Sequence, residues 1–506
     1  MAVYLRPGVY VSENLNATPP SAGASTLTYG AFVGAVNQGP TTPTLVTSWP
    51  QFTKLYGNWQ NDSTDTLRLA VRSFLVDNGG GACYVARVPG SGGATASRQF
   101  YDSSGGGGSA GSVVTLSIAA ANSGAWGNNL FVDIVKATPT ATTFSLVVYS
   151  GDSTSSSIVE RFTDLSMSTT DPRYAVKVVN STSVWVYLTD LSDPATGYAD
   201  APSAVLGAQL AGGANATGGQ TSSVIAASVA NFDTVLQSLV INAPGVTVAS
   251  DVNTIIAYAA ARTDCFVVVD PGASTASDQL TLAASYTASS YAAVYYPNII
   301  ISDPTTTAPG VTRSIAPGGA VVGQYLSTDK QRGVFKSPAG LNTRLGGAVS
   351  VTTLTNADLD SLNSAAAPVN AIRYINGSGI VIMGARTLKQ GYVDKYVSVR
   401  RSLIYLEKTL SDLTRYAIFE PNDSRLWRQL TATCENFLSD FWRQGGLRGD
   451  TPQQAYYVLA NATNNTLTTI DSGEVHIDLG VALQRPAEFV VIKISQFDGG
   501  VTVTTA

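Results

Sequence analysis

The chain has 506 residues, of which 44% are hydrophobic and only 13% are charged, and its formal net charge is −5 at pH 7. This length and apolar content predict several domains with cores of their own. The net charge excludes a global basic field, so we expect no direct nucleic acid binding.

The charged share is about half the usual value, so the surface must be mostly small and uncharged polar residues. Such a surface suits a subunit that packs against copies of itself, and it suits a secreted β-rich protein equally. Cys83, Cys265 and Cys434 lie far apart in apolar contexts, which argues against a disulfide framework or a zinc site. The N-terminus lacks a signal-peptide core, and no run reaches the roughly 18 apolar residues of a membrane helix. We therefore expect synthesis in a reducing cytosol without membrane insertion.

Residues 1–25 have the pattern of an arm. Val9, Tyr10 and Val11 lie in a strand-forming stretch in which the two valines share a face, and the small residues of Ala17–Ser25 suit a tether. Residues 26–88 then alternate between a buried strand, Thr26–Val36, two helices and a second strand. Those last three elements are expected at Pro50–Tyr56, Thr64–Asp77 and Ala82–Val88.

Residues 89–213 differ in composition from what precedes them. Gly-rich stretches open and close this segment, and five β-type runs lie between them, including Tyr174–Val179. A phosphate-binding loop needs a lysine after its glycines and a helix behind them, and neither is present. We expect an inserted β-rich domain at the periphery of the protein.

Phe232–Ile301 alternates helices with apolar runs, which is typical of βαβ units with strands buried on both faces. Asp270 follows one such strand, at the position where an enzyme of this class places a carboxylate. The alternative to a catalytic role is that Asp270 is a structural turn residue. Further along, we expect helices at Val311–Tyr325 and from Ala357 to Leu362, and a strand at Asn370–Ile375.

The last quarter has the clearest pattern. An apolar run, Gly379–Leu388, precedes a helix at Tyr396–Leu410, and a buried strand is expected at Tyr416–Phe419. Asn422 or Asp423 would cap the following helix, which Gly445-Gly446 ends. That helix, Arg425–Gln444, carries its apolar residues on one side: Leu426, Trp427, Leu430, Cys434, Phe437, Leu438, Phe441 and Trp442. The apolar stripe of the preceding helix is Val399, Leu403, Leu406 and Leu410.

Two strand-like runs follow, Glu474–Leu483 and Pro486–Gln496. The tail after them has a Gly499-Gly500 hinge and the alternating pair Val501 and Val503, so a second strand-forming arm is expected at residues 497–506.

The sequence offers little for catalysis. His476 is the only histidine and lies in a strand-like run, where a half-buried structural role is the favoured interpretation over a general base or a metal ligand. The HExxH, CxxC and Walker motifs are absent from the sequence. We therefore expect no catalytic residues, no metal and no cofactor.

Several phrases in one order resemble those of contractile tail sheath proteins, the sheaths of myophage tails and of related bacteriocin and injection particles. They cover about a third of the chain. The phrases are RPGVYVSE (Arg6–Glu13), GVFKSPAG (Gly333–Gly340), GARTL (Gly384–Leu388), VRRSLIYLE (Val399–Glu407), FEPND (Phe419–Asp423) with Leu426-Trp427, and RPAEFVVIKI (Arg485–Ile494).

The resemblance implies a structural subunit that stacks as hexameric rings around an inner tail tube and contracts to drive the tube through a cell envelope. It implies partners: copies of itself, the inner tube protein, and baseplate and tail terminator proteins. The location would be a virion tail assembled in the host cytoplasm. The terminal arms of relatives are woven into the C-terminal domains of neighbours, and a charged helix of that domain grips the tube. The matching helix here presents Arg425, Arg428, Glu435 and Arg443 opposite its apolar side.

We therefore expect a mixed α/β, multi-domain fold, in which an α/β sheath domain is built from N- and C-terminal parts of the chain and carries an inserted β-rich domain. The division is 1–25 arm, 26–88 core, 89–213 insert, 214–345 βαβ domain, 346–496 C-terminal domain and 497–506 arm. Two alternatives stay open: a doubly wound α/β enzyme, on the strength of Asp270, and a β-rich surface adhesin.

Overall fold

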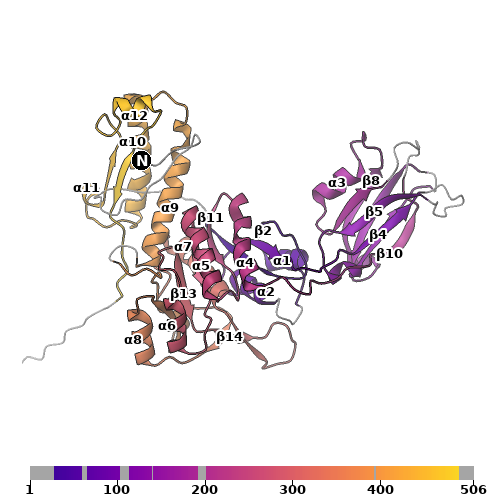
Figure 1. Ribbon diagram of the computed structural model, residues 1–506, viewed down its shortest axis with the longest axis horizontal. Coiled ribbons are helices and arrows are strands. Elements are labelled where there is room, and N and C mark those ends of the chain that lie inside the picture. Colours follow the sequence, from indigo (N-terminus) through magenta and orange to yellow (C-terminus); the bar gives the residue numbers. More distant parts are fainter. Residues whose placement is uncertain are drawn as a thin grey trace, which may run out of the picture.

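The computed structural model describes residues 28–59, 65–102, 113–138, 141–191, 201–391 and 395–488. Within these ranges the chain forms three parts along one long axis. A central α/β body lies between a β-rich unit at one end and a helical C-terminal unit at the other (Figure 1).

An eight-stranded sheet in the order β18-β17-β13-β12-β11-β1-β3-β2 forms the central body. Strand β1 pairs in parallel with β3 on one side and with β11 on the other, and the parallel ladder continues through β12, β13 and β17. Antiparallel β18 and β2 end the sheet. The strands are β1 Thr28–Ala35, β2 Thr44–Val46, β3 Cys83–Val88, β11 Ser238–Asn242, β12 Cys265–Val269, β13 Ala292–Tyr296, β17 Val369–Ile375 and β18 Gly379–Ile382.

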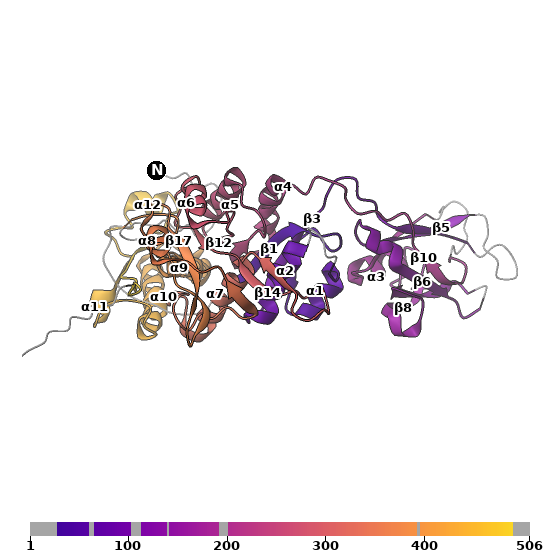
Figure 2. The ribbon, with the colours of Figure 1, turned by 90° about the horizontal axis from the view of Figure 1, so that it is seen from below.

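Helices cover both faces of this sheet (Figure 2). One face packs against α1 (Trp49–Tyr56), α2 (Asp65–Arg72), the π-helical turn η1 (Ser73–Asp77), α7 (Gly318–Arg332) and the start of α9. The other packs against α4 (Ser222–Ala227), the 3₁₀ turn η4 (Ser228–Thr234), α5 (Ala249–Arg262), α6 (Ala276–Ala284) and α8 (Asn356–Ser364). All residues of β11, β12 and β13 are buried, as their apolar runs predict. The expected α/β class and its βαβ units are confirmed.

Several of these helices start where the sequence supplies a cap. Ser48 accepts a hydrogen bond from the Gln51 amide ahead of α1, and Thr355 forms a capping box with Asp358 ahead of α8. The expected helix at Val311–Tyr325 is wrong in its first half. Residues Thr312–Ile315 form strand β15, and α7 begins only at Gly318, because Pro317 disfavours helical backbone before it.

Strand β15 belongs to a small separate sheet with β14 (Ile299–Ser302) and β16 (Ala348–Val351). Strands β17 and β18 follow β16 in sequence and pair with the central sheet. Residues 369–382, which were expected in a C-terminal domain starting at 346, are thus part of the central body.

The β-rich unit has two sheets and a hydrophobic core of its own. One sheet has the order β10-β6-β7-β8 and the other β4-β5-β9. The elements are β4 Ser97–Tyr101, β5 Val114–Ala120, η2 Ala125–Asn129, β6 Leu130–Val135, β7 Thr143–Ser150, η3 Ser155–Ser157, β8 Ile158–Ser166, α3 Ala175–Thr182, β9 Val186–Asp190 and β10 Val205–Gln209. Two neighbouring chain segments connect it to the body. They are paired through a β-bridge between Ser91 and Gly218 and another between Ala94 and Ala214.

Helix α3 is a correction, since Tyr174–Val179 was expected to be a strand. Its buried residues, Ala175 and Val179, are spaced by four, which is helical spacing. The side chain of Asn180 ties the helix to β9, accepting from the Leu188 amide at 2.7 Å and donating to the Leu188 carbonyl at 2.9 Å.

The C-terminal unit consists of two long helices and a two-stranded sheet. The elements are α9 Val397–Leu413, η5 Arg415–Ala417, α10 Ser424–Arg443, α11 Pro452–Ala455, β19 Tyr456–Leu459, α12 Leu467–Asp471 and β20 Asp478–Val481. The strand expected at Tyr416–Phe419 is wrong: the link between α9 and α10 turns through η5, and Phe419 is 89% exposed with a φ of 69°.

Candidate assembly surfaces

Helix α9 is shared by two hydrophobic cores. Val397 and Ile404 pack in the core of the central body, and Leu406 and Leu410 pack in the core of the C-terminal unit. Of the predicted apolar stripe, Leu403 is only half-buried and Ile404 is buried in its place. One continuous helix therefore fixes the C-terminal unit to the body.

Two buried arginines strengthen this joint. Arg401 is 4% exposed, and its Nη1 donates to Asp329 Oδ1 of α7 at 2.9 Å. Its guanidinium lies 4.8 Å from the centre of the Tyr325 ring, and that of Arg400 lies 4.5 Å from the Tyr291 ring. Burying two cations is costly unless each is paired, and ion pairing and cation–π contacts supply the pairing here.

Helix α10 presents one buried and one exposed face. Asp423 caps it, accepting from the amides of Arg425 and Leu426 at 2.8 and 2.9 Å; these hydrogen bonds, that from Leu426 first, lower the pKa of its carboxyl. Seven of the eight predicted apolar residues are buried, and Trp442 is half-buried. The helix ends at Gly445-Gly446 as predicted, with Gly445 at a φ of 86°.

The exposed face of α10 carries the four residues expected to contact a tube. Arg425, Arg428, Glu435 and Arg443 are all exposed. Arg443 lies 3.4 Å from Asp440 Oδ1, a pair so exposed that it contributes little to stability. The positive charge is thus concentrated in the first two turns, at Arg425 and Arg428.

The sheet formed by β19 and β20 is short and open. The two strands are antiparallel: Tyr456 pairs with Val481 at one end, and Leu459 pairs with Asp478 at the other. Among the described residues no third strand extends this sheet. A bridge between Leu447 and Leu483 lies just beyond β20. The apolar side chains packed from this sheet and its flanks onto α9 and α10 are only partly buried: Tyr456, Val458, Ile477, Leu479, Val481 and Leu483. Unpaired strand edges next to incompletely covered apolar residues are suited to strand addition.

The arm residues that were expected to pair with such edges lie outside the described ranges. These are Val9, Tyr10 and Val11 at the N-terminus and Val501 and Val503 at the C-terminus, together with most of the predicted strand at Pro486–Gln496.

Asp270 occupies a closed position at the carboxyl end of β12. It is 1% exposed, and its Oδ1 accepts from the Gly318 amide at 2.9 Å, at the first residue of α7. A Cβ built on Gly318 would lie 2.2 Å from Asn242 and 2.3 Å from Asp270, so the helix fits only with glycine there. An internal carboxylate thus fills the helix N-terminus at which α/β enzymes bind a ligand's anion. This geometry supports the structural interpretation of Asp270.

This burial predicts a pH effect. Desolvation raises the pKa of Asp270 from 3.8 to about 6, although hydrogen bonds oppose the shift. A carboxyl whose pKa is raised on folding stabilises the fold most below pH 4 and loses that contribution as pH rises to 6. We expect Asp270→Asn to remove a decline of about 3 kcal/mol over this range. Urea unfolding of both proteins between pH 4 and 7 measures it; a difference between them that does not change with pH contradicts the assignment.

The other candidate chemical groups are paired or buried in the described part of the chain. His476 is 43% exposed at its side chain and pairs with Glu474 at 2.9 Å. The three cysteines are free and buried, and burial raises the pKa of each thiol. Over the described ranges, no group of three or more His, Cys, Asp or Glu side chains is placed to hold a metal. No helix there is both long and apolar enough to span a bilayer.

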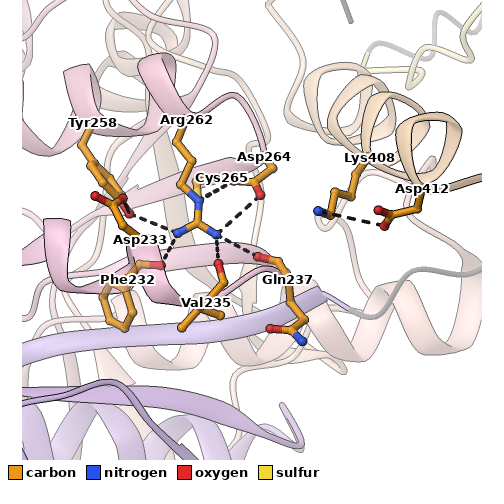
Figure 3. Close-up of polar contacts among 10 residues, drawn as sticks. All are labelled: Phe232, Asp233, Val235, Gln237, Tyr258, Arg262, Asp264, Cys265, Lys408 and Asp412. Carbon is orange, nitrogen blue, oxygen red and sulfur yellow. Dashed lines mark hydrogen bonds and ion pairs between the residues drawn. The ribbon is translucent and has the colours of Figure 1, made fainter. Parts of the chain in front are cut away.

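A shallow hollow lies between α9 and the N-terminal edge of the parallel strands, lined by residues that include Thr28, Ser238, Asp264 and Tyr405. Beside it, Arg262 binds the carbonyls of Phe232, Val235 and Gln237 and the carboxylate of Asp264, across from Lys408 and Asp412 of α9 (Figure 3). Arg262, the last residue of α5, thus uses its donors on carbonyls at and after the end of η4, so this cluster ties α5 to η4.

The fold described above is shared, over nearly the whole chain, with several solved structures. The fold resembles the sheath complex of an extracellular contractile injection system (PVC) in its contracted state, with 22% identity, a TM-score of 0.56 and coverage of 98% of this chain and 99% of that one. It resembles the helical sheath of the anti-feeding prophage (AFP) in its contracted state, with 21% identity, a TM-score of 0.57 and coverage of 98% and 100%. A sheath tail protein from Listeria innocua matches with 13% identity, a TM-score of 0.61 and coverage of 92% and 96%.

Sequence comparison points the same way. Residues 394–497 match the family model of the phage tail sheath C-terminal domain. The tail sheath protein of Vibrio phage KVP40 is 25% identical over 178 residues, which is 35% of this chain and about a quarter of that protein's length. The resemblance to contractile tail sheath proteins is confirmed, and the matched region begins just ahead of α9 and ends within residues 489–506.

Proposed function

We propose that this chain is the repeating structural subunit of a contractile sheath in a phage tail or a related injection particle. Copies assemble as a helical stack of hexameric rings around an inner tube, and contraction drives the tube through a cell envelope. The observation that carries the proposal is the open sheet β19–β20, which packs against α10 within the region that matches the sheath C-terminal domain.

The proposed links between subunits are strand additions. The N-terminal stretch Val9, Tyr10 and Val11 and the C-terminal stretch with Val501 and Val503 pair with the edges of β19–β20 in neighbouring copies. Each added strand supplies backbone partners to an open edge and covers the half-buried apolar side chains behind it. Because the arm of one copy meets the sheet of another, the contact is heterologous, the kind that builds rings where the rotation closes and open helices where it does not.

The proposed tube contact is the exposed face of α10. Contacts that slide during contraction are better made by polar and ionic groups than by an apolar seam. Arg425, Arg428 and Arg443, with Glu435 among them, would meet acidic groups on an inner tube protein. Baseplate and terminator proteins would contact the two ends of the stack, in a tail assembled in the host cytoplasm.

The β-rich unit is proposed to lie at the outer rim. Its own core and its two-segment connection make it separable from the body. We expect excision of residues 91–218, with Gly90 joined to Gly219 through a short Gly-Ser linker, to leave polymerisation intact. The excision removes one acceptor of the buried Arg87, the Ser123 carbonyl at 2.9 Å, so a slightly lower melting temperature is expected. Insoluble protein would argue against this boundary.

The proposal is tested by concentrating the purified chain and measuring its sedimentation and its appearance by negative-stain microscopy. Tubes or stacked rings are expected, whereas a compact monomer at every concentration would exclude a sheath role.

A further inference from the structure

Two of the phrases that resemble sheath proteins, GARTL and RPAE, meet in space although they lie about a hundred residues apart. Arg386 Nε donates to Glu488 Oε1 at 2.9 Å, and Nη2 donates to Oε2 at 2.5 Å. The side chains are 9% and 19% exposed. This is the bidentate, largely desolvated arrangement in which an arginine–carboxylate pair is strongest.

Arg386 is itself fixed to the central sheet. The side chain of Asn370, on β17, donates to the Arg386 carbonyl at 2.8 Å and accepts from its amide at 2.7 Å. A third guanidinium nitrogen, Nη1, donates to the Asn363 carbonyl at 2.6 Å. Both the backbone and the side chain of Arg386 are therefore held by the body.

Glu488 has a second hydrogen-bond partner, Tyr396, next to Arg386. The Tyr396 hydroxyl donates to its Oε2 at 3.3 Å, and Tyr396 is bridged to Arg386 through the backbone. Burial opposes ionisation of Glu488, but the hydrogen bonds from Arg386 outweigh it and lower the pKa of the carboxyl. The carboxylate is thus ionised and doubly held at neutral pH.

The contact at Glu488 lies between the C-terminal unit and the last residues of the chain. After β20, Ala482 pairs with Arg448 and Ala455 of the C-terminal unit, and the chain then reaches the edge of the central body at Glu488. Residues 489–506 follow directly. Without the contact at Glu488, a force on residues 489–506 would act directly on residues 482–488. It would break their hydrogen bonds to the C-terminal unit one after another, and then those of β20.

We propose that Arg386, Tyr396 and Glu488 form a tether that anchors the root of the C-terminal segment to the central sheet. Load carried by residues 489–506 then passes into the body through the ion pair and does not strip β20 from β19. The inference rests on the proposed function for the source of the load, but the tether itself is testable in the isolated subunit.

The test uses the full chain with Glu488→Gln, which keeps the shape of the side chain and removes its charge. We expect amide exchange at Arg448 and Ala482 to rise about tenfold in the monomer, because their hydrogen bonds open more often. The concentration needed for polymerisation should also rise about tenfold, while the melting temperature of the body stays unchanged. Arg386→Lys should raise exchange at the same two amides, since lysine cannot bind the carboxylate in a bidentate manner. It also loses the Nη1 hydrogen bond to the Asn363 carbonyl, so a lower melting temperature of the body is expected for this variant alone.

Asp77→Asn is the matched control. Asp77 pairs with Arg72 at 3.1 Å between α2 and η1, with side chains 27% and 11% exposed, and its loss should change neither exchange at Arg448 and Ala482 nor the polymerisation threshold. If Glu488→Gln gives no soluble protein, Tyr396→Phe removes only one hydrogen bond and should raise exchange about threefold. Unchanged exchange in both the Glu488 and Arg386 variants would overturn the tether. A wild-type chain that never polymerises would overturn the proposed function and leave the exchange result standing.

Discussion

Removing residues 1–20 should give a folded subunit that no longer polymerises. The deletion ends ahead of Thr28, where β1 enters the centre of the eight-stranded sheet, so the body keeps all its described strands. The added strand is lost, and with backbone hydrogen bonds worth roughly 1 kcal/mol each, four residue pairs make the loss at least about a hundredfold in affinity. Analytical ultracentrifugation and circular dichroism of the variant measure assembly and folding separately.

The deletion variant keeps its own β19–β20 sheet, which provides an internal control. Mixed with the wild-type chain, it should still accept an arm but offer none, and so shorten the polymers. Deleting Gly499–Ala506 should give the same loss from the other terminus. Normal polymers from either deletion, or a variant that fails to fold, would contradict the proposal that the arms link subunits.

Reversing the positive face of α10 should separate sheath assembly from tube binding. In Arg425→Glu, Arg428→Glu and Arg443→Glu combined, the buried side of the helix is untouched, so the subunit should fold and assemble. Acidic groups on a tube would then meet like charges, and the fraction of sheaths that enclose a tube should fall at least about tenfold. Co-expression with the inner tube protein and electron microscopy would measure this fraction.

The control for this variant makes the same charge change elsewhere. Arg98, Arg161 and Lys177 are exposed on the β-rich unit, and their combined reversal to glutamate should leave tube enclosure unchanged. Tube-filled sheaths from the α10 variant would show that another surface makes the contact.

The elements with strong periodicity and explicit end signals were predictable from sequence. Helix α10 has an apolar side at helical spacing, an aspartate cap and a Gly-Gly stop, and the structure reproduces all three. The parallel strands were visible as apolar runs because both of their faces are buried. The strand predicted at Tyr174–Val179 was wrong because valines also pack well on a short helix when their spacing fits a helix.

The residues that join the parts of the molecule were not predictable in the same way. Arg400 and Arg401 look like an exposed charged pair on a helix, but aromatic rings and Asp329 from distant segments make their burial tolerable. Arg386 and Glu488 lie on separate phrases, and no local pattern indicates that they meet. Phe419 is apolar and yet exposed, at a φ of 69° in the link between α9 and α10.

The central claim is that copies of this chain enclose a lumen with α10 facing inward. Helical reconstruction of the assembled protein by cryo-electron microscopy tests it most directly. We predict rings in which α10 lines the lumen, a strand from each neighbour extends β19–β20, and the β-rich unit lies at the outer rim. A polymer whose lumen is lined by the β-rich unit, or a β19–β20 sheet that stays two-stranded between subunits, would contradict it.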